Sequence, residues 1–357
     1  MMLQVTLLCA IFCLSGARAP LAIFDAAHFQ NPAASELAEA DRLSAQVFDL
    51  FKRSEFEEAV PLAKRALKIR EKALHPNDAR IADAQSNLAE LHLALQHYGE
   101  AESLFRKAIK IYELEGKTHA KSVANALDRV ALLREFARKP KEAEDLYLRA
   151  IALRQSVLGA GHAETKDALD RLATFYTKRK DYGKALPILR QLVAEGEKKY
   201  GPTDVQFGKL MERLACVLHS NKETTEAEKI EARANAILYA DAARKNEPLI
   251  LSQASFDCRL INNPHPVFPN AAKGRFMGSI TLILAVEVDE TGQVSKAQMV
   301  VGDPLFKGAS ERAALSATLR PLVVNGQAVK FKGTITHGFS VVTSTQIVAV
   351  PGMVRSP

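Results

Sequence analysis

Cysteine is scarce in this sequence of 357 residues, which contains four. Cys9 and Cys13 lie in an N-terminal leader, so Cys216 and Cys258 are the two that remain for the rest of the chain. Two cysteines are too few for a disulfide framework. Because they fall in two different predicted domains, we favour two separately buried thiols, and a bridge between them stays open as the alternative.

Motifs of several enzyme classes are missing as well. The chain has no phosphate-binding G-x-x-x-x-G-K-[ST], no H-E-x-x-H, no paired C-x-x-C, and neither G-x-S-x-G nor S-x-x-K. We therefore expect no enzymatic activity, no cofactor and no bound metal. One alternative is a thiolate–imidazole pair, because Cys216 and His219 are three residues apart on one helical face. Two unrelated side chains are the simpler interpretation.

Charged and apolar residues do not form long blocks. The net charge is +7, but the basic and acidic residues are interspersed, so we expect no nucleic-acid partner. The longest apolar run, residues 5–14, is followed by Ala17-Arg18-Ala19. This pattern is typical of a secretory signal peptide, and the run is shorter than the ~20 residues of a membrane span. We predict a signal peptide at residues 1–19.

A strict internal repeat is the strongest signal that is present. Apolar residues occur three and seven positions after a marker alanine, and these spacings line one face of a helix. The marker follows a charged residue and recurs every 42 residues, at Ala59, Ala101, Ala143, Ala185 and Ala227. Such a period indicates an array of one repeated supersecondary unit.

The repeat resembles the tetratricopeptide pattern. In the second repeat, the large Leu88 and the small Ala89 lie on the first helix, and Tyr98 and Phe105 follow on the second. The 42-residue period is similar to that of kinesin light chains. The resemblance implies an all-α tetratricopeptide superhelix of five helix pairs at residues 36–240, followed by a linker at residues 241–259.

In tetratricopeptide proteins, the first helix of each pair lines a concave groove. Carried onto this sequence, the groove is rich in acidic side chains and has apolar positions, which suits a basic or mixed extended peptide. Merely solvated helix faces remain the alternative. The groove residues that we single out are Asp83, Glu90, Asn125, Asp128, Leu132, Glu135, Phe136, Asp167, Asp170 and Thr174.

A second pattern begins where the helical period fades. Apolar and polar residues alternate, turn residues separate the segments, and one stretch is rich in Ala and Leu. The predicted elements are a strand at 280–288, a turn at 289–292, a strand at 294–301, a helix at 309–319 and a strand at 329–341.

This order resembles the C-terminal domain of TonB-type proteins. The matching residues are Phe268-Pro269, Ala271-Ala272, Gly278, Asp289 to Gly292, Val294, Ala313-Ala314, Pro321, Asn325-Gly326 and Val329. The resemblance implies a small α+β domain at residues 260–345 and a tail at residues 346–357, in a multidomain chain. In TonB the last strand accepts a partner segment as an added strand. The same edge here would present Val329, Phe331, Ile335 and Phe339.

The two resemblances together imply an exported adaptor in the periplasm or cell envelope of a Gram-negative-type bacterium. It would bind peptides or partner proteins, and an outer-membrane protein is one possible partner. The alternative is a TonB-like transducer, or an accessory of outer-membrane transport, that keeps its leader as an anchor. The oligomeric state is not predicted.

Overall fold

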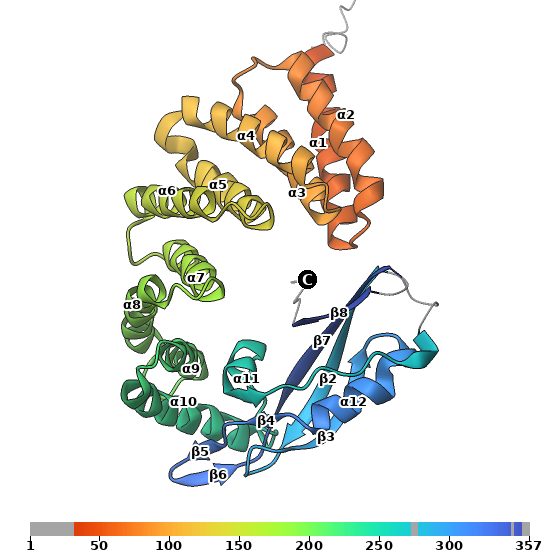
Figure 1. Cartoon of the computed structure of the whole chain (residues 1–357). Helices are drawn as coiled ribbons and strands as arrows, with labels where there is room; N and C mark the ends of the chain where they lie inside the picture. Colours follow the sequence, from red (N-terminus) through yellow and green to blue (C-terminus); the bar gives the residue numbers. More distant parts are fainter. Residues whose placement is uncertain (1–31, 273–277, 344–345, 352–357) are drawn as a thin grey trace, which may run out of the picture. The chain divides into compact units, whose positions relative to one another are not determined.

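The computed structural model describes residues 32–272, 278–343 and 346–351 (Figure 1). The predicted signal peptide lies outside the described residues. The chain divides into two compact units, one ending at Ala137 and one beginning at Arg138. In the described part, no helix has both the length and the hydrophobicity needed to cross a bilayer.

The first unit consists of helices that pack in sequence order. α1 packs on α2, α3 packs on α2 and α4, and α4 also contacts α5. Their bounds are α1 Pro32–Lys52, α2 Phe56–Ala73, α3 Ala79–Ala94, α4 Tyr98–Leu114 and α5 Ala120–Phe136, with a short 3-10 turn at Gly116–His119.

The second unit continues the same arrangement with α6 to α10. Successive helices contact each other, and α9 and α10 form the last pair. The bounds are α6 Pro140–Leu158, α7 Ala163–Lys178, α8 Tyr182–Tyr200, α9 Val205–Ser220 and α10 Thr224–Lys245.

The marker alanines are fully buried in the array. All five, one at the start of each second helix, are 0% exposed. The absence of a larger side chain lets the two helices of a pair approach closely. The turn before the second helix of each pair also repeats. In each of these turns, at intervals of 42 residues, one non-glycine residue has a positive φ. These residues are Ser54, Gln96, Arg138, Lys180 and Lys222.

The C-terminal part of the second unit is a small antiparallel sheet with the strand order β3-β2-β7-β8. The predicted alternation is confirmed in β2 (Gly278–Val288), where Leu282, Leu284, Val286 and Val288 are at most 2% exposed. Helix α12 (Lys307–Leu315) packs on β2 and β3. The other strands are β3 Val294–Val301, β7 Phe331–Thr343 and β8 Gln346–Pro351, with short pairs β1 Leu260–Asn262 with β4 Thr318–Leu319 and β5 Leu322–Val324 with β6 Gln327–Val329.

Two segments are more structured than the sequence indicates. The predicted linker contains the end of α10 and a helix, α11 (Gln253–Arg259), which contacts both α9 and β7. The predicted tail contributes β8 to the sheet. The sequence of neither segment has a helical repeat or a long alternation. Contacts with distant parts of the chain position both segments, so no local pattern predicts them.

Candidate polypeptide-binding faces

In the first unit, the predicted groove residues lie on α3 and α5. Asp83 is exposed and accepts a hydrogen bond from the hydroxyl of Tyr112 at 2.6 Å. Burial raises the pKa of Tyr112, and the bond to Asp83 raises it further, so the phenol stays a donor. Further along α3, Glu90 Oε1 accepts a hydrogen bond from Arg129 Nε of α5 at 2.7 Å. This bond links α3 to α5.

A pocket of about 130 Å³ opens beside these residues and is lined by α3, α4 and α5. Its polar lining includes Ser86, Glu90, Asn125 and Arg129. Asn125 is exposed, whereas Asp128, Leu132 and Glu135 on the same helix are half-buried. The face therefore offers polar groups of both charges and an amide to a polypeptide backbone.

An exposed aromatic pair lies at the end of α5. Phe136 is 53% exposed and its ring contacts that of Tyr98, at 5.1 Å between centroids. Large aromatic side chains that remain accessible are typical anchors at protein interfaces, because they bury much area at little entropic cost. Phe136, which we predict as an apolar groove position, is thus accessible on the surface of the first unit.

In the second unit, the predicted residues of α7 are engaged by α9. Arg213 NH2 donates to Thr174 Oγ1 at 2.6 Å, and the same guanidinium forms an ion pair with Asp170. Thr174 Oγ1 in turn donates to the Asp170 carbonyl at 2.9 Å. Asp167 is exposed. Two of the predicted acidic groove residues, Glu90 and Asp170, thus form ion pairs with arginines.

The arginines that do this were missed by the sequence analysis. Arg129 and Arg213 pair with groove carboxylates, and they belong to a series at Arg129, Arg171 and Arg213 with the same 42-residue step as the marker alanines. Their 42-residue spacing is the sequence signal that could have identified them. They were not identified because they lie outside the positions assigned to the groove.

The predicted strand-addition edge is wrong. β7 lies inside the sheet, because β2 pairs with it on one side and β8 pairs with His337 to Thr343 on the other. Towards the start of β7, the Lys332 amide donates to the Leu249 carbonyl at 2.8 Å, and the Leu251 amide donates to the Lys332 carbonyl at 2.9 Å.

The side chains assigned to that edge are core residues or belong elsewhere. Phe331, Ile335 and Phe339 are at most 2% exposed, and Val329 is part of β6, where it pairs with Leu322. A long strand with one buried face is typical of both edge and central positions. Only the partner strands, which are remote in sequence, decide between them.

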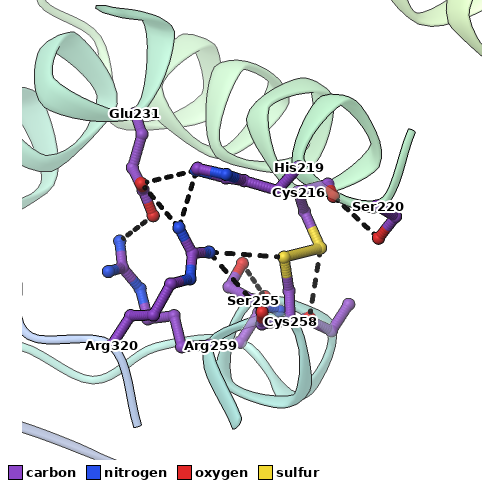
Figure 2. The surroundings of a disulfide bond; sticks show 10 residues. Cys216, His219, Ser220, Glu231, Ser255, Cys258, Arg259 and Arg320 are labelled. Atoms are coloured by element: carbon purple, nitrogen blue, oxygen red, sulfur yellow. Dashed lines mark hydrogen bonds and ion pairs between the residues drawn. A yellow bond between two sulfur atoms is a disulfide. The ribbon is translucent and has the colours of Figure 1, made fainter. Parts of the chain in front are cut away.

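The two cysteines form a disulfide, which corrects the expectation of separate thiols. Cys216 of α9 is bonded to Cys258 of α11, with 5.7 Å between their Cα atoms (Figure 2). A bonded sulfur cannot act as a thiolate nucleophile. His219 Nε2 instead lies 2.9 Å from Glu231 Oε2 and 2.7 Å from a guanidinium nitrogen of Arg320. The thiolate–imidazole pair of Cys216 and His219 is therefore not present in this structure.

Comparison with known proteins agrees with the helical part. A tetratricopeptide repeat family model matches residues 38–113 and 122–194. The helix pairs within these two ranges are thus similar to tetratricopeptide repeats. Repeats of this class bind protein or peptide partners and are typically non-catalytic scaffolds. The comparison with curated proteins returns no match.

Solved structures are similar to part of this chain. BtubC (BKLC) from P. vanneervenii is 21% identical, with a TM-score of 0.50, over 59% of this chain and 89% of that chain. A putative kinesin light chain from Podosopora anserina with nearly identical TPR-like repeats is 20% identical, with a TM-score of 0.49, over 61% of this chain and 100% of that chain. At such identities the likeness to BtubC shows the fold alone.

Proposed function

We propose that the protein is an exported scaffold whose tetratricopeptide repeats bind a segment of another polypeptide. The observation that carries the proposal is the α3–α5 face of the first unit, where exposed Asp83 and Asn125 accompany the exposed Tyr98–Phe136 pair. Such a mixture of aromatic anchors and polar groups is typical of protein-binding surfaces.

The partner segment that fits this face carries both basic and apolar residues. The accessible carboxylate of Asp83 favours basic residues, whereas Phe136 favours an apolar one. Because Arg129 already pairs with Glu90, the face is less negative than its carboxylates alone indicate. Binding should therefore depend only moderately on salt.

Export to the periplasm or cell envelope is part of the proposal. The leader pattern at residues 1–19 supports it, and so does the Cys216–Cys258 disulfide, since disulfides persist mainly in oxidising compartments. The order of β2, β3, α12 and β7 supports a TonB-like C-terminal domain. With β7 paired on both sides, this domain would contact other envelope components through another surface.

Photo-crosslinking from single positions tests the binding face. A photo-reactive residue placed at Asn125 or Phe136 should crosslink the full chain to a discrete set of envelope proteins. The same residue at Lys107, which is exposed on the second helix α4, is the matched control and should not. Equal crosslinking from all three positions would contradict the proposed face. Mass spectrometry of the same preparation should find a mature chain beginning at Pro20.

A further inference from the structure

The inner face of the fifth repeat is covered by the chain itself. α9 is the first helix of this repeat, and α11 lies directly against it, between α9 and β7 (Figure 1). The disulfide joins the C-terminal half of α9 to the end of α11 (Figure 2). Cys216 occupies the position that Thr174 has one repeat earlier, so the bond emerges from a predicted groove position.

The comparison of two equivalent acidic residues shows what α11 covers. Asp170 in the fourth repeat and Glu212 in the fifth are 42 residues apart. The Asp170 side chain is 40% exposed, whereas Glu212 is 5% exposed. Burial raises the pKa of Glu212, and Ser255 of α11 is close enough to lower it in part. A side chain from α11 has replaced solvent at this position of the groove.

A buried arginine holds the end of α11 to the repeat. Arg259 is 2% exposed, and its guanidinium lies 2.7 Å from a Glu231 oxygen and donates to Asn235 Oδ1 at 3.0 Å. Burial lowers the pKa of Arg259, while Glu231 counteracts the shift. Arg320 also approaches Glu231, at 3.3 Å (Figure 2). Removing one partner of such a buried pair is costly, because the other charge stays buried.

Apolar contacts extend the same attachment towards the sheet. Phe256 of α11 is 0% exposed and belongs to one hydrophobic cluster with Leu238 of α10, Leu251 and Phe331. Its ring lies so close to Gly333 of β7 that no Cβ atom could be accommodated there. The segment therefore has an apolar anchor, a charged anchor and a helical turn between them, which are the features of a bound peptide.

We propose that the inner face of the fifth repeat is a polypeptide-binding site whose ligand is the chain's own segment 249–262, and that the Cys216–Cys258 bond locks this ligand in place. The site is thereby closed to an external partner, which must use the preceding repeats. The C-terminal domain follows directly after this segment and is held on the repeat by it.

Cutting the chain in front of the segment tests this proposal. A protease site inserted between Asn246 and Glu247, at an exposed turn, allows the folded full chain to be cleaved into an array fragment and a C-terminal fragment. Dithiothreitol then converts the disulfide into two thiols and is itself oxidised to a cyclic disulfide. We expect the reduced fragments to stay associated at about 1 µM, because the contacts of a binding site remain.

Variants of the charged anchor provide the specific readout. Arg259→Ala should weaken the association of the reduced fragments at least tenfold, and Arg259→Lys should weaken it less. Arg312→Ala, on the exposed face of α12, is the matched control and should leave it unchanged. Thermal melting of each uncleaved variant identifies any that fail to fold.

The proposal is overturned if the wild-type fragments separate on reduction, or if Arg259→Ala and Arg259→Lys both associate as tightly as the Arg312→Ala control. In the first case, the disulfide alone would hold the segment, and in the second, the anchor would contribute nothing. No external partner enters this experiment, so its outcome is independent of the proposed function.

Discussion

His337 is a histidine that the folded chain keeps neutral. It is 1% exposed, in β7 between Ile335 and Phe339, and neither ring nitrogen has a hydrogen-bond partner among the described residues. Burial lowers the pKa of His337 to about 4, with a smaller contribution from His265. An imidazolium at this position would be an unpaired charge in an apolar core.

The pH dependence of stability follows from this shift. The pKa of His337 is about 6.5 in the unfolded chain, so the unfolded state binds more protons as the pH falls below that value. The free energy of unfolding of the C-terminal domain should therefore decrease from pH 6.5 towards pH 4, by up to about 3 kcal/mol. Denaturant titrations at several pH values measure the decrease.

Two variants assign this effect to His337. His337→Leu should remove most of the decrease between pH 6.5 and pH 5, where few carboxylates titrate. His265→Ala removes the neighbouring exposed histidine and should leave most of it. If His337→Leu retains the wild-type slope in that interval, the buried imidazole is not its source.

At the scale of elements, the sequence predicts what periodicity can encode. The marker alanines, such as Ala101, locate the second helix of each pair, and the alternation of apolar and polar residues at 280–288 locates β2. The helix predicted at 309–319 instead ends at Leu315, because Thr318 and Leu319 pair with β1. That pairing depends on a strand far away in the chain, and no local pattern indicates it.

The same limit applies to the candidate site. The alignment of the 42-residue repeats predicts the first helix of each pair, and the structure has α3, α5 and α7 at the predicted residues. This prediction requires only the repeat period. Their charge state was not predictable from the groove positions alone, since Arg213 neutralises Asp170 from the next repeat. The pairing of Cys216 with Cys258 depends on α11, which the sequence analysis assigned to a linker.

The close approach of paired helices leads to a second prediction. Ala101 is 0% exposed where α4 meets α3, so Ala101→Leu forces extra methylene groups into a filled contact. We expect a loss of about 1–3 kcal/mol in the free energy of unfolding. Ala94→Leu, at the exposed end of α3, is the matched control and should change it little. Equal losses in denaturant titrations of the two variants would contradict close packing at the marker position.

At the scale of the whole molecule, the fifth repeat has two roles in the second unit. It ends the array, and its helices α9 and α10 share contacts with the C-terminal domain, including the bond from Asn235 Nδ2 to the Val323 carbonyl at 3.1 Å. Terminal repeats usually need a polar outer surface to end an array in solvent. Here the last repeat has a folded domain packed against it, so the array and the domain should unfold cooperatively at this junction.

Loss of the disulfide tests that cooperativity. The bond closes a loop with a sequence separation of 42 residues, and removing such a cross-link typically costs about 2–4 kcal/mol, mainly through the unfolded state. Cys216→Ser with Cys258→Ser should therefore lower the free energy of unfolding by this amount. Because Arg259 and Phe256 still hold α11, the rate of backbone amide hydrogen exchange in native buffer should increase only moderately. The increase should occur in α9, α11 and β7 together. An increase confined to α11 would show that the segment is fixed by its covalent bond and that repeat and domain are not coupled through it.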